Sequence, residues 1–293
     1  MSPWVWLNED YCPADQARVS VFDRGFLFAD GVYEVTAVVN GQLLDFHAHM
    51  QRLQRSCQAL ELALPWAVET LQQIHETLVA RNKVQEGSVY LQLTRGNPGK
   101  RDFHYPDASV PPTLVVFTQS YNILQDARVE SGLSVVTCPD IRWQRCDIKT
   151  VSLLAASMAK MAAQAQGADD AVFVKDGLIT EASSANCFMV TPGGKLVTRA
   201  LSQAILPGIT RAAILDICQQ HQLEIETRAF SPQEACSARE VFITSATTFV
   251  MPVTRLDGNP IGDGRPGPVA ISLRNAYLAR FGAGLQCDAN TFE

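Results

Sequence analysis

The sequence predicts a two-domain α+β protein. The chain has 293 residues, about twice the roughly 150 residues that are usual for one domain. Hydrophobic residues make up 47% of the chain and charged residues 18%, so it can bury a sizeable core. Strand-like and helix-like patterns alternate in two blocks, which a polar stretch at residues 119–130 separates. We therefore expect an N-terminal domain at residues 1–122 and a C-terminal domain at residues 123–293.

The first block predicts a hairpin, two helices and two further strands. Asn40-Gly41 is a hairpin-turn pair that follows a run rich in β-branched residues, and apolar spacing of helical period comes after it. The strands are expected at residues 31–39, 42–46, 88–94 and 113–118, and the helices at about 49–62 and 66–78.

The second block has the same mixture of patterns. An alanine-rich helix follows an irregular segment at residues 139–150 and ends at Gly167, while Asp176-Gly177 is a strong hairpin signal. Ser231 and Glu234 form a capping box, so a helix begins there. The expected strands lie at residues 133–138, 171–174, 178–180 and 241–244.

Composition and charge exclude several classes of protein. The net charge of −6 argues against nucleic-acid binding, and no apolar run reaches the roughly 18 residues that a membrane span requires. The N-terminus has no signal-peptide pattern, so we expect a cytoplasmic protein. Eight scattered cysteines without a C-x-x-C pair indicate buried thiols, and the spacing of His47 and His49 suits none of the common metal sites, so we expect no metal.

Lys149 is a candidate nucleophile among only six lysines. It lies in the irregular run just before an apolar helix, close in sequence to Arg142 and Arg145. Positive neighbours lower the pKa of a lysine and favour its neutral, nucleophilic form. An ordinary loop lysine paired with Asp147 accounts for the same pattern, and local spacing alone favours that reading.

Two segments suit an anion. Leu206–Arg211 reads LPGITR, so the backbone N–H groups of Ile209 and Thr210 would point out of a helix start. The hydroxyl-rich run after Thr244 offers similar donors. Glu181 ends a hairpin strand, where a carboxylate can contact a protonated ring nitrogen or equally cap a solvent-facing turn.

The glycines at 262, 264 and 267 match the dinucleotide fingerprint letter by letter. The match has no strand before it, contains a proline and lacks a βαβ unit. We therefore expect an ordinary loop here.

Taken together, the motifs resemble the fold type IV, pyridoxal-phosphate-dependent aminotransferases over about residues 5 to 280. They occur in the order and at the spacings of that family. The motifs are Asp23-Arg24-Gly25, Asp30-Gly31-Val32-Tyr33-Glu34, His49-x-x-Arg52-Leu53, DIRWQRCDIKT (140–150), EASSAN (181–186), LPGITR (206–211) and TSATT (244–248). Within the family, the run around Lys149 and the Arg101 segment are most similar to the D-amino acid transaminases. The resemblance implies an active site in the cleft between the two domains.

The resemblance also assigns roles to residues of the cofactor site. Lys149, in the C-terminal domain, would form the Schiff base with pyridoxal phosphate and then move the substrate proton. Glu181 would keep the pyridine nitrogen protonated. The phosphate would be bound by Arg52, by the amides of Ile209 and Thr210, and by the loop at Ala246 and Thr247. The family often has a hydroxyl residue in place of Ala246, so that contact would come from the backbone.

Tyr33, Arg101 and His104 match the positions that bind the substrate carboxylate in the family. The arginine would reach in from a neighbouring subunit, which implies a homodimer. This chain departs from the usual pattern, because Phe103 stands where the histidine is expected and His104 is displaced by one residue. Loss of a carboxylate donor would make an (R)-amine transaminase a serious alternative.

We expect a transaminase that moves the amino group of a D-amino acid, D-alanine or D-glutamate, to a 2-oxo acid such as 2-oxoglutarate or pyruvate. Three alternatives stay open. The first is an L-branched-chain aminotransferase or an aminodeoxychorismate lyase of the same fold. The second is the (R)-amine transaminase, and the third is a catalytically silent cofactor binder.

Overall fold

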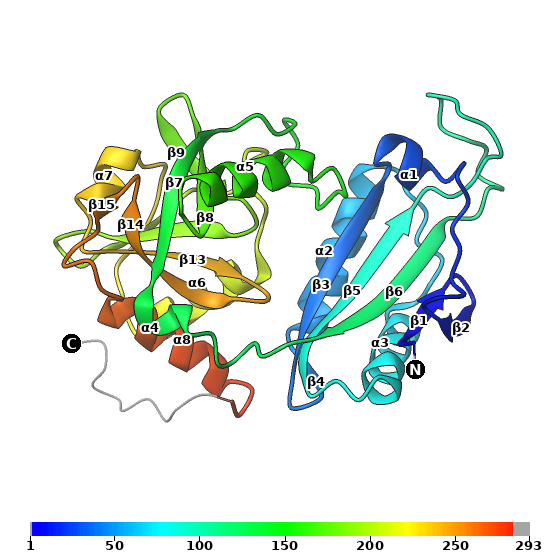
Figure 1. Cartoon of the computed structure of the whole chain (residues 1–293), viewed down its shortest axis with the longest axis horizontal. Coiled ribbons are helices and arrows are strands. Elements are labelled where there is room, and N and C mark those ends of the chain that lie inside the picture. Colours follow the sequence, from blue (N-terminus) through cyan, green and yellow to red (C-terminus); the bar gives the residue numbers. More distant parts are fainter. Residues whose placement is uncertain (1, 284–293) are drawn as a thin grey trace. The chain divides into compact units, whose positions relative to one another are not determined.

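The computed structural model describes residues 2–283, and its backbone contacts divide the chain into two units (Figure 1). Unit 1 contains the chain up to Leu124 together with Ile148–Leu153, and unit 2 contains Gln125–Asp147 and the chain from Leu154 onward. The expected boundary near residue 122 falls close to the first of these divisions. The segment that carries Lys149 was expected in the C-terminal domain, but it groups with unit 1. The reason is that Thr150 pairs with Val32 in a β-bridge and that Ile148 is buried in the core of unit 1.

In the part of the chain that the structure describes, the strands of unit 1 form one antiparallel sheet, in which the strand order differs from the order along the chain. Its strand order is β2-β1-β6-β5-β3-β4. The strands are β1 (Trp4–Leu7), β2 (Asp10–Pro13), β3 (Gly31–Val39), β4 (Gln42–Leu43), β5 (Glu86–Thr94) and β6 (Thr113–Ser120). The long strands β3 and β5 pair over their whole length, with Gly31 opposite Thr94 and Val39 opposite Glu86.

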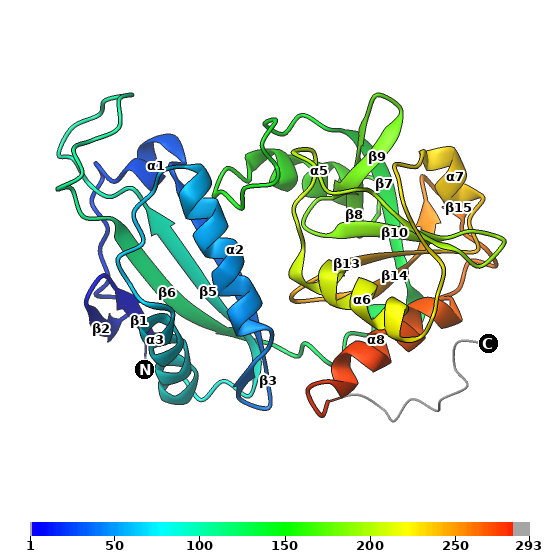
Figure 2. The same ribbon diagram turned by 180° about the vertical axis from the view of Figure 1, so that it is seen from behind.

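Two helices, α2 (Phe46–Ala59) and α3 (Val68–Arg81), lie across one face of this sheet (Figure 2). Their apolar faces pack on alternate strand residues, as the period of two along a strand requires. The short helix α1 (Arg24–Phe28) precedes β3, and the Asp23 side chain caps it by accepting from the N–H of Gly25.

The predicted strand at residues 42–46 is too long, and the helix after it begins earlier than expected. Asp45 has a positive φ of 52°, which ends β4 and turns the chain directly into α2 at Phe46. Phe46 is buried and lies edge-on to His75 of α3. Phe46, which the pattern assigned to the strand, is therefore the first residue of α2 and packs between α2 and α3.

The strands of unit 2 form a larger mixed sheet within the described residues. Its order is β12-β11-β10-β13-β14-β7-β8-β9, and β15 pairs with β14 at the side. The strands are β7 (Leu133–Pro139), β8 (Asp170–Lys175), β9 (Leu178–Ala182), β10 (Asn186–Val190), β11 (Leu196–Thr198), β12 (Ile225–Thr227), β13 (Glu240–Ser245), β14 (Phe249–Leu256) and β15 (Asn259–Pro260). Successive residues Val172 and Phe173 belong to different apolar clusters, so both faces of β8 are covered.

The helices of unit 2 are α4 (Arg128–Ser131), α5 (Leu154–Ala165), α6 (Ile209–Gln220), α7 (Pro232–Cys236) and α8 (Pro268–Ala279). Helices of this unit pack against its sheet, among them α5 on β8, α6 on β13 and α8 on β14. The predicted capping box is confirmed at the start of α7, where the Ser231 hydroxyl accepts from the N–H of Glu234 and the Glu234 carboxylate accepts from the N–H of Ser231.

Between residues 2 and 283, none of the helices is both long and apolar enough to cross a membrane. The cytoplasmic location stays a prediction.

Candidate active site

Lys149 lies in a short segment that two elements of unit 1 hold from either side. Its backbone carbonyl accepts from the N–H of Tyr33 in β3 at 3.0 Å, and its own N–H donates to the Ser56 hydroxyl of α2 at 3.4 Å. The Nζ atom lies 4.2 Å from the centre of the Tyr33 ring. Asp147, the alternative partner considered above, is bound by Arg145 at 2.9 Å. The backbone of Lys149 is therefore fixed, and its amine rests on an aromatic ring.

The two arginines near Lys149 in sequence both have carboxylate partners. Arg142 binds Asp140 at 2.7 Å and also Glu181, while Arg145 binds Asp147. Burial lowers the pKa of Arg142, but its carboxylate partners raise it by more, and the net pKa is above the usual value. The charge that was expected to act on Lys149 is thus offset by carboxylates.

Tyr33 is held in place by a stack of aromatic rings on the sheet. Its ring stacks on Tyr90 with centres 5.5 Å apart, and Tyr90 stacks on Phe117 at 4.9 Å. The Tyr90 hydroxyl donates to the side-chain carbonyl of Gln92 at 2.8 Å. Burial raises the pKa of Tyr90 well above its usual value, so its hydroxyl stays protonated. These contacts fix the ring that faces the lysine amine.

Arg52 belongs to a buried ion pair of unit 1. Its Nε and Nη2 atoms donate to the two carboxylate oxygens of Glu34, each at 2.8 Å, and His49 Nδ1 lies 2.7 Å from the same carboxylate. Burial alone would raise the pKa of Glu34, but Arg52 and His49 together lower it to about 2. The structure therefore gives Arg52 a carboxylate partner, and its role toward a phosphate stays a prediction.

Glu181 lies at the end of β9 in unit 2, where it is buried and held on both oxygens. One oxygen accepts from Arg142, and the other accepts from Asn186 Nδ2 at 3.0 Å and from the N–H of Leu206 at 3.1 Å. Asn186 also donates to the carbonyl of Leu206 at 2.9 Å, which ties Glu181 to the loop before α6. A carboxylate in this position is a fixed negative charge, and the reading of Glu181 as a solvent-facing cap is wrong.

The start of α6 has the features of an anion site. The N-cap residue of α6 is Gly208, which has no side chain to accept hydrogen bonds from the first helical N–H groups, those of Ile209 and Thr210. Thr210 is 2% exposed, and its buried hydroxyl has no hydrogen-bond partner. The buried Thr244 hydroxyl at the end of β13, against which α6 packs, also has no partner. Buried hydroxyls without partners are costly unless a ligand binds them.

The turn after β13 contains the other predicted phosphate contacts. Ser245 accepts from the Thr248 N–H at 3.1 Å, and the hydroxyls of these two residues are 2.7 Å apart. Ala246 and Thr247 are half-buried at the tip between them. The turn is thus held by the hydroxyl groups of Ser245 and Thr248.

The glycine-rich match at 262–267 is a loop that leads into α8. Gly267 is the N-cap of that helix, and the buried carboxylate of Glu240 accepts from the N–H groups of Val269 and Ala270. A Cβ on Gly267 would lie only 2.0 Å from the Glu240 carboxyl carbon. The helix start already holds a carboxylate of the protein, so the dinucleotide match is rejected on structural grounds. Residues 2–283 contain no cluster of three or more metal-ligand side chains.

Arg101 and His104 lie in the exposed loop between β5 and β6. The Arg101 guanidinium lies 5.0 Å from the ring centres of both Phe28 and Phe103, and the two rings are 5.2 Å apart. The His104 side chain is 94% exposed, and its Nδ1 lies 3.1 Å from Asp102. The displaced histidine is thus paired with a neighbour in its own loop, while Phe103 contacts the arginine.

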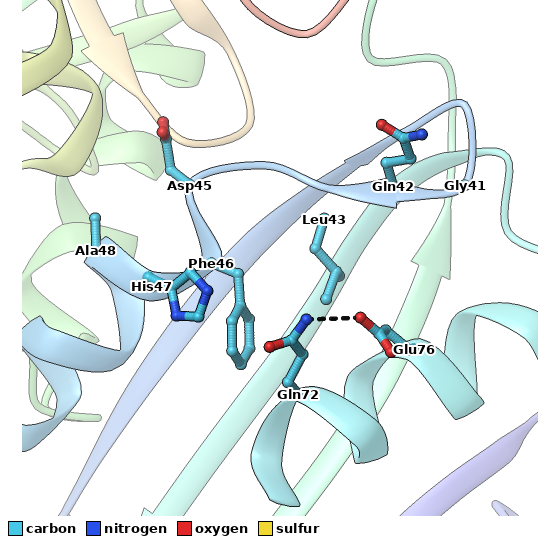
Figure 3. Close-up of a pocket in the computed structure, with 9 residues that line it drawn as sticks. All are labelled: Gly41, Gln42, Leu43, Asp45, Phe46, His47, Ala48, Gln72 and Glu76. Atoms are coloured by element: carbon cyan, nitrogen blue, oxygen red, sulfur yellow. Dashed lines mark hydrogen bonds between the residues drawn. The ribbon is translucent and has the colours of Figure 1, made fainter. Parts of the chain in front are cut away.

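A pocket of about 690 Å³ lies beside the hairpin between β3 and β4 and the start of α2 (Figure 3). The figure shows Phe46 and His47 on one wall, and Gln72 donating to Glu76 on the other. None of the predicted site residues lines this pocket. We conclude that the pocket is separate from the predicted chemistry.

The structure brings the predicted residues together within each unit. In unit 1, Tyr33 and Arg52 lie on β3 and α2, the two elements that bind the Lys149 segment. In unit 2, Glu181 is tied to the loop that leads to Ile209 and Thr210. Sequence reasoning did not predict the contacts of four residues: Ser56 with the Lys149 backbone, Arg142 and Asn186 with Glu181, and the buried hydroxyl of Thr244. Arg142, Asn186 and Thr244 belong to the recognised motifs, which was the available signal, whereas Ser56 follows Arg52 by about one helical turn.

Comparison with known proteins shows the family of this chain. The family described as Amino-transferase class IV matches residues 31–256. The chain is 36% identical over 273 residues to the D-alanine aminotransferase of Staphylococcus aureus (strain N315), covering 93% of this chain and 96% of the relative. It is also 36% identical over 279 residues to the D-alanine aminotransferase of Bacillus licheniformis, covering 94% and 97%.

Solved structures share the fold. The branched-chain amino acid aminotransferase from Escherichia coli has a TM-score of 0.86 at 20% identity and covers 99% of this chain and 100% of its own. A hypothetical aminotransferase from Mycobacterium tuberculosis, in a PLP-bound form, has a TM-score of 0.81 at 22% identity and covers 94% and 98%.

The chain therefore belongs to the class IV aminotransferases, and it is an enzyme with their two-unit α+β fold. Within that class, the curated relatives described above are D-alanine aminotransferases.

Proposed function

We propose that this protein is a pyridoxal-phosphate-dependent transaminase that moves the amino group of a D-amino acid to a 2-oxo acid. D-Alanine or D-glutamate is the donor, and 2-oxoglutarate or pyruvate is the acceptor. The observation that carries the proposal is the 36% identity to D-alanine aminotransferases over 93% of the chain. The arrangement of Lys149, Glu181 and the start of α6 supports it, because each supplies one of the functions that the cofactor requires.

Lys149 is the residue that attaches the cofactor and moves the proton. Pyridoxal phosphate supplies an aldehyde for covalent attachment and a ring that stabilises negative charge at the substrate Cα. The Nζ of Lys149 would hold that aldehyde carbon covalently, and once the substrate amine has displaced it, the freed amine would move the proton from the substrate Cα to that carbon. The contacts to Tyr33 and Ser56 fix the backbone from which the Lys149 side chain extends. The aromatic ring of Tyr33 lies beside Nζ, with its centre 4.2 Å away.

Glu181 supplies the negative charge that keeps the pyridine nitrogen protonated. A carboxylate beside a ring nitrogen favours the protonated nitrogen by about 1.4 kcal/mol for each pKa unit. Arg142 and Asn186 hold the two carboxylate oxygens in a fixed orientation. Glu181 is buried, so little of this interaction is lost to solvent.

The start of α6 binds the phosphate group. The N–H groups of Ile209 and Thr210 and the Thr210 hydroxyl are donors at the positive end of the helix dipole. We assign Arg52 and the turn at Ala246 and Thr247 to the same group. The unpartnered, buried Thr210 hydroxyl supports this assignment, because a phosphate oxygen would satisfy it.

We propose that the enzyme works as a homodimer in which Arg101 serves the active site of the second copy. Large apolar side chains are exposed on both units, among them Phe26 of α1 and Leu154 and Met161 of α5. The buried face of α5 consists of Ala159 and Ala163, so its larger side chains point to the outside. Exposed apolar side chains of this size favour a subunit contact.

An (R)-amine transaminase is the second candidate function. Phe103 occupies the position of the expected histidine and packs on Phe28 and Arg101, so the loop presents one carboxylate donor less. Such a site tolerates amines that have no carboxylate. The fold neighbours also keep an L-branched-chain aminotransferase as an alternative.

The test is the visible absorption spectrum of the purified protein with pyridoxal phosphate, titrated separately with D-alanine, L-leucine and (R)-1-phenylethylamine. We expect D-alanine to remove the visible band of the lysine-bound cofactor and L-leucine to leave it unchanged. A response to L-leucine alone would make the protein a branched-chain enzyme, and a response to the amine alone would favour the second candidate. Lys149→Ala should have no such band, whereas Lys175→Ala, a change at an exposed lysine, should keep it.

A further inference from the structure

The loop that carries Arg101 is bound to an arginine in the interior of unit 1. Arg24, the first residue of α1, is 3% exposed, and its Nε donates to Asp30 at 2.7 Å. Its Nη1 donates to the backbone carbonyl of Asp102 and, at 3.2 Å, to that of His104. One buried guanidinium thus holds two carbonyls of a loop whose own side chains are mostly exposed.

A second buried arginine holds the same loop at Tyr105. Arg95 shares Asp30 with Arg24, at 2.9 Å, and its guanidinium lies 3.6 Å from the centre of the Tyr105 ring. Arg95 also donates to the carbonyls of Leu60 and Glu61 after α2, so it is itself held firmly. The segment from residue 101 to residue 105 is therefore fixed to the body of unit 1 over its whole length.

The side chain of Arg101 is positioned by the same group of residues. Its guanidinium lies 5.0 Å from the centres of the Phe28 and Phe103 rings, and the Arg24 guanidinium lies 4.6 Å from Phe28. Contacts of this kind favour one placement of a cation over an aromatic face. Phe28 thus connects the buried arginine to the exposed one.

We propose that Arg24 is a positioning residue that presets the 101–105 segment for carboxylate recognition, and that Phe103 orients Arg101 in place of the displaced histidine. This inference rests on the proposed function, in which Arg101 binds the substrate carboxylate. An exposed loop arginine loses side-chain and backbone freedom when it binds an anion, and this loss weakens binding. A loop that is already held loses less freedom on binding, so Arg101 alone can bind a carboxylate without a histidine as second donor.

The test compares Arg24→Lys with wild type in the full-length protein with its cofactor. Lysine keeps the positive charge, but its single Nζ cannot occupy both the Nε position, from which Arg24 donates to Asp30, and the Nη1 position, from which it donates to the two carbonyls. We expect KM for D-alanine to rise by about tenfold with little change in kcat. KM for (R)-1-phenylethylamine, which has no carboxylate, should stay within about twofold. Arg18→Lys is the matched control, because Arg18 donates to two backbone carbonyls only within its own exposed turn.

Phe103 is tested by two substitutions that differ in the ring. Phe103→Leu should raise KM for D-alanine by several-fold, about the extent expected for one lost cation–π contact. Phe103→Tyr, which keeps an aromatic ring, should leave this KM near the wild-type value. Equal increases for D-alanine and for the amine in either Arg24→Lys or Phe103→Leu would overturn the proposal, since a general loss of structure affects both donors alike.

Limited trypsin digestion provides a readout that does not depend on activity. Lys100 and Arg101 are exposed cleavage sites within the held loop. We expect cleavage there to be faster by about fivefold or more in Arg24→Lys than in wild type or in Arg18→Lys. Unchanged cleavage would show that Arg24 does not hold the segment and would overturn the proposal. If wild type acts on neither donor, the proposed function fails, and the digestion result alone decides whether Arg24 fixes the loop.

Discussion

Replacing Glu34 with glutamine should destabilise unit 1 and change its response to acid. The side chain of Glu34 is fully buried and accepts two hydrogen bonds from Arg52 and one contact from His49. The substitution keeps the shape but removes the charge, so the Arg52 guanidinium loses its ionic partner in the interior. A buried charge that loses its partner costs several kcal/mol.

The magnitude follows from the pKa of Glu34. Its usual pKa of 4.5 is lowered to about 2 in the folded protein, and a difference of this size corresponds to about 3 kcal/mol in favour of the folded state. Because the folded pKa is the lower one, this stabilisation is fully present above pH 4.5. It is lost as the pH falls from about 4.5 to about 2.

Urea unfolding of the cofactor-free protein, followed by circular dichroism at pH 7 and at pH 3, measures both effects. We expect Glu34→Gln to lower the free energy of unfolding at pH 7 by about 3 kcal/mol and to weaken its dependence on pH below 4.5. The double variant Glu34→Leu/Arg52→Met should lose only about 1 kcal/mol, because it removes both charges together. Glu76→Gln, at an exposed carboxylate of α3, is the control and should change stability by less than about 0.5 kcal/mol. The reasoning is refuted if Glu34→Gln behaves like this control, or if the double variant loses the sum of the two single losses.

Three further predictions concern the reaction. Lys149→Ala should reduce the single-turnover rate with D-alanine by at least about a thousandfold, because the proton-moving amine is gone, and a rate near wild type in stopped-flow measurements would exclude its role. Thr210→Val should weaken pyridoxal-phosphate binding by about tenfold in a fluorescence titration, whereas Thr36→Val, at another buried hydroxyl without a partner, should leave it unchanged. Arg101→Ala should raise KM for D-alanine by about tenfold or more and KM for an (R)-amine far less; equal increases would contradict its carboxylate role.

The parts of the fold that the sequence predicts are those with a local signal. Strand β3 is predicted by its β-branched residues and the Asn40-Gly41 turn, and helices α2 and α3 by their helical spacing, since these signals are properties of the segment itself. The start of α2 could not be found in this way, because the positive φ of Asp45 leaves no trace in the hydrophobic pattern. Strand β1 was missed as well. It has only four residues, and it pairs with the equally short β2 as well as with the distant β6, where Trp6 lies opposite Val116.

In the candidate site, too, the sequence motifs identify residues, whereas only the structure gives the contacts between them. Lys149, Glu181 and Thr210 stand in motifs of several residues, so the sequence alone could point to them. The bond from Arg142 to Glu181 joins two motifs through strand pairing and a loop, and spacing within either motif does not reveal it. Likewise, the loop at Phe103 suggested a lost donor in the sequence, whereas the structure adds that this ring packs on the Arg101 guanidinium.

The grouping of Ile148–Leu153 with unit 1 has a consequence for how the protein is made. During synthesis the first 124 residues leave the ribosome well before this segment, so the bridge between Val32 and Thr150 cannot form in that early chain. Closing such a long loop is slow compared with forming the hairpin of β3 and β4 or the helices around it. Lys149 therefore reaches its place beside Tyr33 late, after the sheet to which its segment binds can already have formed. A newly made N-terminal unit therefore has strand β3 but lacks the segment that pairs with it, and the contact between Lys149 and Tyr33 forms only when residues 148–153 return to that strand.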